Sequence, residues 1–223
     1  MASNQITSIL KSAIKALSCI SLILMVIHSS AVAETIFSPD FSDPTSLESF
    51  QTLVPPKTKD TVKISKRNLL VIAGKNSSID LIAGDAAWAD YTLTIGYKLT
   101  LPRANSGIDI CLRNVQMQPQ DKPGGISIHF KRHQKTGKPI RWIRQYGNRD
   151  RDIMPDQKAP VFDDGKWHRI SISMKARDLH VEMDGEEFFS MEDVLDIERG
   201  NVMISVSDGA RLTIREFRVE SLP

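Results

Sequence analysis

Residues 163–189 read DDGKWHRISISMKARDLHVEMDGEEFF and give the clearest structural signal in the chain. The apolar side chains recur at every second position in two runs, which are Ile170, Ile172 and Met174, then Leu179, Val181 and Met183. Such alternation is typical of strands that cover a core with one face. One Asp-Gly pair precedes the first run and another follows the second, and glycine accepts the positive φ of a tight turn. The stretch therefore predicts a hairpin of two antiparallel strands.

Similar alternation extends over much of the chain. It is longest in residues 91–101, YTLTIGYKLTL. Shorter runs are Ile108/Ile110/Leu112, Ile126/Ile128/Phe130 and Val202/Ile204/Val206. Sequences rich in glycine, asparagine and aspartate separate these runs, as turns require. Many short strands joined by such turns indicate a two-sheet sandwich or a barrel.

Three segments depart from this regular pattern. In the last run the apolar phase changes from even to odd positions, which predicts a β-bulge near Arg215–Glu216. Short helical turns are expected only near residues 45–51 and 191–197. The polar stretch 147–160 is expected to be a long loop, and long loops in compact domains are often functional.

The N-terminal segment has the features of a secretion signal. Lys11 and Lys15 precede the apolar stretch 16–27, which is too short to span a bilayer comfortably. Residues 31–33, AVA, give the small-x-small pattern that signal peptidase prefers. We therefore expect residues 1–33 to be cleaved and residues 34–223 to form a single domain, secreted or periplasmic, without a stable membrane span. An uncleaved membrane anchor is the alternative interpretation.

Charge and cysteine content narrow the class of protein further. The chain has 29 Lys and Arg against 27 Asp and Glu, and residues 1–33 hold two of the basic residues and none of the acidic ones. The remainder is formally neutral, which argues against a nucleic-acid or membrane-surface protein. It retains only Cys111, so it cannot form an internal disulfide. Paired CxxC, HExxH, P-loop and GxSxG motifs are absent from the sequence.

Several motifs, taken in order, resemble one known family. Residues 164–170, DGKWHRI, followed by 183–185, MDG, resemble a hairpin of concanavalin A-like jelly rolls, including laminin G-like domains. Residues 105–108, NSGI, with Arg113, and the closing strand 214–219, IREFRV, are similar to the branch called the 3-keto-disaccharide hydrolase domain. The resemblance implies an all-β fold, a concanavalin A-like jelly-roll sandwich of two antiparallel sheets. It also implies that ligands bind on the concave sheet or on the loops at its rim.

Trp167 and His168, at the mouth of the hairpin, are expected to be structural. A tryptophan beside an Asp-Gly turn most often packs over the end of the sandwich, and ligand stacking is the alternative. His168 is expected to be a turn residue rather than a catalytic base.

The strands that match the concave sheet of the family lie within residues 105–146 and carry the candidate site. If the apolar residues of the two runs at 108–112 and 126–130 face the core, their neighbours face the concave side. These neighbours are Asp109, Cys111, Arg113, Ser127, His129 and Lys131. We expect Asp109 and His129 to be catalytic, because histidine titrates near neutrality, and Arg113 and Lys131 to bind the ligand. Ordinary glycoside hydrolysis uses two carboxyl groups, and only Asp109 is found on this face.

The strand 140–146, IRWIRQY, allows two registers. One exposes Trp142, Arg144 and Tyr146, and the other exposes Arg141, Ile143 and Gln145. We favour the first, because two aromatic rings beside an arginine would provide a stacking surface and a fixed hydrogen-bonding fork for a sugar. In the alternative interpretation, Trp142 and Tyr146 are core aromatics.

Positive charge is concentrated in residues 131–151, which contain eight Lys and Arg residues and one acid, Asp150. A solvated hairpin tip would explain this concentration. Attraction for an acidic glycan, such as a uronate or sulfated polymer, is the alternative.

Three functions fit these observations. The first is a carbohydrate-binding domain whose partner is an acidic or modified oligo- or polysaccharide. The second is a glycoside hydrolase of the 3-keto-disaccharide hydrolase type, which the resemblance implies, or a uronate lyase. The third is an envelope or extracellular protein-interaction domain. No cofactor is expected, although Asp40, Asp43, Asp163 and Asp164 offer the oxygen ligands that Ca²⁺ prefers, without a diagnostic spacing.

Overall fold

The predicted hairpin forms as strands β11 (Trp167–Lys175) and β12 (Asp178–Met183) of a two-sheet sandwich. The structure is a computed structural model that describes residues 33–53, 60–115, 124–136, 138–146, 151–153, 162–194 and 197–223. Residues 33–222 belong to one compact unit. No helix in the described ranges is long and apolar enough to cross a membrane.

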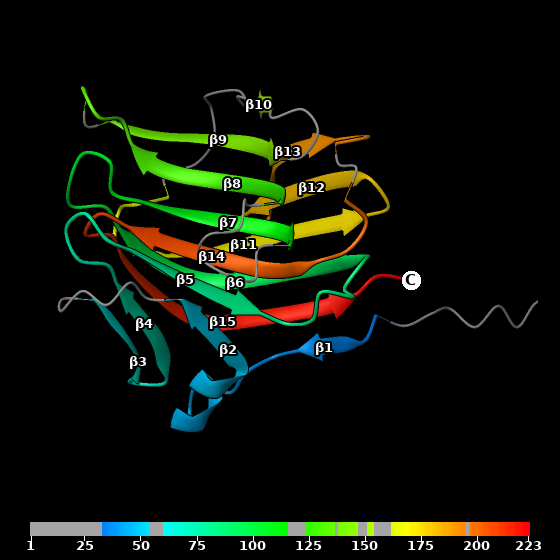
Figure 1. Cartoon of the computed structure of the whole chain (residues 1–223), viewed down its shortest axis with the longest axis horizontal. Coiled ribbons are helices and arrows are strands. Elements are labelled where there is room, and N and C mark those ends of the chain that lie inside the picture. Colours follow the sequence, from blue (N-terminus) through cyan, green and yellow to red (C-terminus); the bar gives the residue numbers. More distant parts are fainter. Residues whose placement is uncertain are drawn as a thin grey trace, which may run out of the picture. The chain divides into compact units, whose positions relative to one another are not determined.

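All described strand pairs are antiparallel, and the strands form two sheets (Figure 1). The first sheet has the order β13 (Glu186–Met191), β12, β11, β6 (Tyr91–Thr100), β15 (Arg211–Ser221), β4 (Asn68–Ile72) and β3 (Thr61–Ser65), and β1 (Thr35–Phe37) also pairs with β15. The second has the order β10 (Arg151–Ile153), β9 (Pro139–Tyr146), β8 (Gly125–Arg132), β7 (Gly107–Asn114), β14 (Asn201–Ser207), β5 (Ser78–Ala83) and β2 (Phe50–Leu53). The predicted all-β, two-sheet architecture is therefore confirmed.

The core lies between the sheets and consists of the alternating apolar residues that the sequence indicates. Ile170, Ile172 and Met174 of β11 are fully buried, and so are their counterparts on β6, β7, β8 and β14. Each such side chain contributes about 1.5–3 kcal/mol through removal of apolar surface from water. Because Cys111 is the only described cysteine, this packing holds the described domain without a disulfide.

The irregular segments agree only in part with expectation. The β-bulge is confirmed, because Ile214 pairs with Tyr97 and Glu216 with Gly96, which leaves Arg215 as the extra residue. A 3₁₀ helix occupies Pro44–Ser49, as expected, and Asp43 caps its N-terminus. The described residues of 191–197 contain no helix. In 147–160, residues 151–153 form β10 rather than loop, and the other residues lie outside the described ranges.

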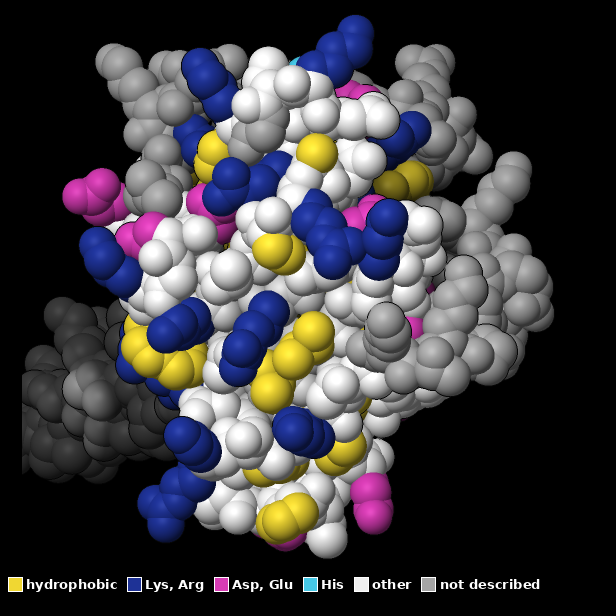
Figure 2. Space-filling model, turned by 90° about the vertical axis from the view of Figure 1, so that its left-hand side faces the viewer, with side chains coloured by type: hydrophobic (Ala, Val, Ile, Leu, Met, Phe, Trp, Pro, Cys, Tyr) yellow, Lys and Arg dark blue, Asp and Glu magenta, His cyan; other side chains and the backbone are white. Residues whose placement is uncertain are grey.

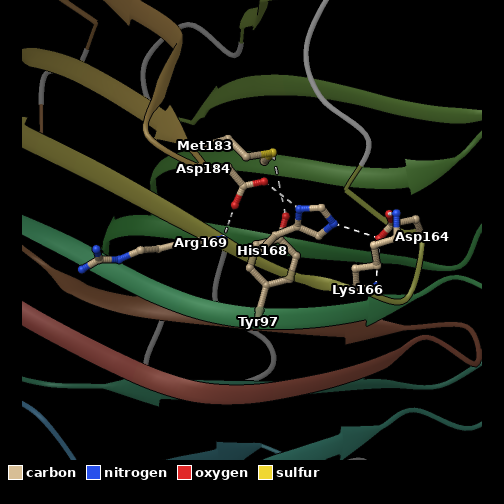
Figure 3. A network of polar contacts seen from close by, with 7 residues as sticks. All are labelled: Tyr97, Asp164, Lys166, His168, Arg169, Met183 and Asp184. Atoms are coloured by element: carbon tan, nitrogen blue, oxygen red, sulfur yellow. Dashed lines mark hydrogen bonds and ion pairs between the residues drawn. The ribbon is translucent and has the colours of Figure 1, made fainter.

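His168 fixes the mouth of the hairpin, as expected for a turn residue (Figure 3). Its Nδ1 lies 2.7 Å from an Asp184 carboxylate oxygen and its Nε2 lies 2.9 Å from an Asp164 oxygen, so both Asp-Gly turns are tied to one imidazole. Asp184 also accepts a hydrogen bond from the backbone N–H of Arg169. The ring is mostly buried beside Tyr97.

This network predicts a pH-dependent stability. Burial of the ring by itself would lower the pKa of His168, but the carboxylates of Asp184 and Asp164 outweigh this effect and raise that pKa. The hydrogen bond from His168 in turn lowers the pKa of Asp164 to about 2. A raised histidine pKa stabilises the fold fully below the unfolded value of about 6.5, and this contribution is lost as pH rises through the folded pKa. The Asp164 contribution is present above about pH 4 and is lost as pH falls towards 2. The network is therefore expected to contribute most between about pH 4 and 6.5.

Urea unfolding at pH 5, 6, 7 and 8 measures the effect. The wild type should lose more stability between pH 6 and 8 than the His168→Gln variant, in which this titration is absent. Equal slopes for the two proteins would mean that His168 does not link folding to protonation.

Candidate functional site

The candidate site lies on the outer face of the second sheet, the face turned away from the core. Five side chains stand side by side across it because their strands pair in register, and we call them the polar row: Asp80, Ser205, Asp109, His129 and Trp142. They come from β5, β14, β7, β8 and β9 in that order, so each is held by regular strand geometry. A rigid platform of this kind can position polar groups against a ligand.

Asp109 and His129 are in direct contact. His129 Nδ1 lies 2.6 Å from Asp109 Oδ1, and Lys131 Nζ lies 3.1 Å from Asp109 Oδ2. Burial by itself would raise the pKa of the Asp109 carboxyl, but His129 and then Lys131 hold it below its ordinary value. Asp109 is therefore a carboxylate near neutral pH, and it orients the imidazole.

The second nitrogen of His129 has no hydrogen-bond partner among the described residues, although it is buried. When Nδ1 donates its proton to Asp109, the neutral ring carries a lone pair on Nε2. A lone pair backed by a carboxylate can accept a proton. Trp142 stacks on the ring, with centroids 4.5 Å apart and an interplanar angle of 12°.

Asp80 is a second acid on this face, and it was not predicted from the sequence. In β5, SIDLIA, the core positions Ile79 and Leu81 flank Asp80, so the same alternation would have placed it on the outer face. Burial raises the pKa of Asp80, the charge of Asp109 adds to this, and a hydrogen bond from Ser205 opposes it. The polar row thus holds two carboxyl groups whose pKa values are moved in opposite directions.

The register of β9 is the one that we favoured. Ile143 is fully buried in the core, which turns Trp142, Arg144 and Tyr146 to the outer face. The guanidinium of Arg144 lies 5.3 Å from the centre of the Tyr146 ring and also contacts Asp152 at 3.6 Å. Both side chains are half-buried, so the predicted aromatic surface is partly accessible.

A hollow of about 420 Å³ adjoins the polar row. Lys131 and Trp142, both predicted to bind the ligand, form part of its wall, together with Asn105, His133 and Ser207. Trp142 therefore borders the hollow and also touches the imidazole. The predicted basic segment is only partly a free surface, because Arg132 is paired with Asp163 at 2.8 Å.

The prediction that Arg113 faces the ligand is wrong. Arg113 has a positive φ of 48°, which breaks the strand alternation, and its side chain is 1% exposed. The guanidinium donates to three backbone carbonyls, of Ala89, Ala176 and Ile197, and to the carboxylate of Asp90 at 3.0 Å. The side chain is therefore engaged inside the protein and is not available to a ligand.

Cys111 faces outward from the second sheet but is fully buried, packed with Ile82 and Met203. Its Sγ lies 3.2 Å from the Gly124 carbonyl oxygen, and burial raises the pKa of its thiol to about 12. It is a packed side chain rather than a reactive thiol.

The acids considered for calcium are engaged with protein partners. Asp40 accepts hydrogen bonds from Ser42, Asp43 caps the 3₁₀ helix, and Asp163 pairs with Arg132, while Asp164 binds His168. Across the described ranges, no group of three or more His, Cys, Asp or Glu residues could hold a metal ion.

Known proteins share both the family and the fold. The family model described as the 3-keto-alpha-glucoside-1,2-lyase-like domain matches residues 42–220, whereas a search of curated proteins gives no match. The metal-free carbohydrate recognition domain of Emp46p is 13% identical, with a TM-score of 0.60 over 82% of this chain and 95% of that chain. The Ca²⁺- and mannose-bound exoplasmic/lumenal domain of VIP36 is 10% identical, with a TM-score of 0.59 over 78% of this chain and 83% of that chain.

A third solved structure belongs to work on the endo-acting O-glycanases with which human gut microbiota initiate mucin breakdown. It is 16% identical, with a TM-score of 0.62 over 85% of this chain and 100% of that chain. At such identities the solved structures establish a shared fold alone, whereas the family model spans most of the sequence. The chain therefore has the jelly-roll fold and belongs to the 3-keto-alpha-glucoside-1,2-lyase-like domain family.

Proposed function

We propose that the chain binds a carbohydrate on the outer face of the second sheet and cleaves a 3-keto glycoside by 1,2-elimination. The observation that carries this proposal is the Asp109–His129 pair, which leaves the buried Nε2 of His129 without a partner among the described residues. The name of the family supports the reaction class, and the carbohydrate recognition domains among the structural neighbours support the ligand class.

The chemistry follows from the 3-keto group. A carbonyl at C3 makes the hydrogen on C2 acidic, so a histidine base can remove it. In the proposed step His129 Nε2 takes this proton, and the electron pair left on C2 is delocalised onto the C3 oxygen as an enolate. The pair then forms the C1–C2 double bond while the bond from C1 to the leaving oxygen breaks. The leaving oxygen takes up one proton, which balances the reaction.

Neighbouring residues have roles that fit this step. Asp109 holds the imidazole in the tautomer whose Nε2 is free to accept a proton. The ammonium of Lys131, 3.1 Å from the same carboxylate, is the candidate cation that offsets enolate charge. Asp80 lies three strands from His129 along the polar row, about 14 Å at ordinary strand spacing, so the proton that the leaving oxygen takes up is assigned to water. Trp142 offers an apolar wall against which a sugar ring can lie.

Binding without cleavage is the second candidate. The burial of Nε2 favours it, because a substrate must displace whatever covers that atom before a proton can move. An acidic or modified glycan remains the proposed ligand in that case. Export by residues 1–33 to the periplasm or the exterior is also part of the proposal, and N-terminal sequencing of the exported protein checks it.

The deciding experiment uses p-nitrophenyl 3-keto-α-glucoside as the probe, with p-nitrophenyl α-glucoside as the matched control. Release of p-nitrophenol from the keto probe alone, above the rate without protein, is expected. Proton NMR should show the unsaturated C1–C2 product. A saturated 3-keto sugar as the first product would show that the reaction is hydrolysis and not elimination. Saturable binding without release would indicate a carbohydrate-binding domain. A protein that does not bind the keto probe and does not release p-nitrophenol would overturn the proposal.

A further inference from the structure

The outer face of the first sheet carries a second cluster of aromatic and basic residues. The expectation that Trp167 packs over the end of the sandwich is wrong, since Trp167 is 38% exposed. It borders a hollow of about 300 Å³ whose other lining residues are Lys98, Thr100, Arg211 and Thr213. We call these five residues, together with Arg215, the Trp167 patch.

The β-bulge in β15 creates this patch. It places two consecutive residues, Arg215 and Glu216, on the outer side between the buried Ile214 and Phe217. A side chain at Gly96 would lie 3.2–3.3 Å from Arg215, so glycine at this position leaves the Arg215 side chain room to lie across the sheet. The guanidinium of Arg215 reaches to 4.8 Å from the centre of the Trp167 ring.

The cations of the patch are not neutralised by protein. Lys98, Arg211 and Arg215 form no ion pair with any described residue, and no carboxylate lines the hollow. The nearby acid, Glu216, is already in contact with Arg169 at 3.4 Å and with Arg218 at 3.8 Å. Figure 2 looks onto the end of the molecule where β11 and β15 begin, and more Lys and Arg than Asp and Glu side chains are in view there. Positive charges that share a surface without ion-pair partners repel one another, and a bound anion would relieve this repulsion.

From this arrangement we infer that the Trp167 patch is a binding site for an anionic saccharide. An exposed indole offers a flat apolar surface for a sugar ring, and the hydroxyls of Thr100 and Thr213 can hydrogen-bond to sugar hydroxyls. The guanidinium of Arg215, 4.8 Å from the centre of the indole, presents a planar fork that matches a carboxylate or sulfate group. The site lies on the opposite sheet from the polar row and does not depend on the proposed elimination.

The test compares three oligosaccharides of similar size by isothermal titration calorimetry: trigalacturonate, a sulfated heparin-derived tetrasaccharide and neutral maltotriose. The wild type is expected to bind one or both anionic probes, more weakly as salt is added, and not maltotriose. The uronate and sulfate arms show which anionic group the site prefers. Absence of binding to both anionic probes would overturn the inference.

Two variants locate the binding, and a matched variant controls for charge. Arg215→Ala and Trp167→Ala should each weaken binding of the anionic probe about tenfold or more, as loss of a charged hydrogen bond or a stacking surface does. Arg218→Ala removes the same charge from the same strand, but its guanidinium is already paired with Glu216 and Glu220, so binding should change less than threefold. Equal losses of affinity in Arg215→Ala and Arg218→Ala would mean that the anionic probe responds to the overall charge of the surface and not to the Trp167 patch.

Two further measurements distinguish the Trp167 patch from the polar row and from a surface that binds any anion. His129→Ala alters the polar row and should still bind the anionic probe, whereas loss of binding would place the anionic saccharide on the second sheet. A single-stranded DNA trimer with one terminal phosphate carries three phosphate groups, as many anionic groups as trigalacturonate has carboxylates. Equal affinity for this trimer would also overturn the inference, because the surface would then select charge rather than a saccharide.

Discussion

Replacement of Arg113 by alanine is expected to lower the free energy of unfolding by about 3–5 kcal/mol, because it removes a buried guanidinium and leaves several acceptors without a donor, at about 1–3 kcal/mol each. Without the guanidinium, the carbonyls of Ala89, Ala176 and Ile197 lose a buried donor. Asp90, which also accepts a hydrogen bond from the Ala176 N–H, loses its ion pair. Urea unfolding at pH 6 measures the change through the midpoint, provided that the slope is unchanged.

Trp167→Ala is the matched control for this prediction. The Trp167 side chain is exposed, so this substitution should change the free energy of unfolding by no more than about 1 kcal/mol, as most surface substitutions do. A stable Arg113→Ala protein together with an unstable Trp167→Ala protein would contradict the structural assignment of both residues. Arg113→Lys should be nearly as harmful as alanine, because one ammonium group cannot reach the four acceptors that the guanidinium serves.

The second large effect concerns the proposed reaction. His129→Gln is expected to lower kcat for p-nitrophenyl 3-keto-α-glucoside by about 10²–10⁴-fold, the usual contribution of a positioned base. Asp109→Asn should also reduce kcat, because an amide can accept a hydrogen bond from Nδ1 but carries no charge to stabilise the imidazolium that forms. Initial rates over a range of probe concentrations separate this loss of kcat from a change in KM.

His180→Gln is the control for the histidine substitution. His180 lies on β12 of the first sheet, where it contacts Glu182 at 3.2 Å, and it should not affect turnover. Exchange of the C2 hydrogen with D₂O gives an independent readout of proton removal, and His129→Gln should abolish it. If turnover and C2 hydrogen exchange were unchanged in His129→Gln, His129 would not be the base of the reaction.

The strands could be predicted because the rule that governs them is local. A strand with one face on the core must alternate, and the Asp-Gly pairs mark where it turns, so the hairpin 163–189 and the β-bulge at Arg215 were both predictable from the sequence. The same rule placed Asp109, His129 and Lys131 on one surface, where they are in contact. It would have found Asp80 as well, had it been applied to residues 78–83.

One error arises where a residue leaves the regular pattern. Alternation assumes extended backbone, and the positive φ of Arg113 turns its side chain into the protein instead. Trp167 has the opposite parity to the buried Ile170 and Ile172 of β11, so the alternation places the indole on the outer face, where it is 38% exposed, and not over the end of the sandwich. The pKa values of Asp80 and Asp109 depend on cross-strand neighbours, which the sequence alone does not identify.

The positions of β14 and β15 determine when the two sheets can close during folding. β14 lies between β7 and β5 in the second sheet, and β15 lies between β6 and β4 in the first, so the final part of the chain joins two separated halves of each sheet (Figure 1). Until that part has emerged from the ribosome, neither sheet can close, and strands such as β6 and β7 retain unpaired edges. Such distant pairings also slow folding, typically to about milliseconds to seconds. Both sheets can therefore close only after β14 and β15 have been synthesised, so pairing of these two strands is the last step in assembling the sandwich.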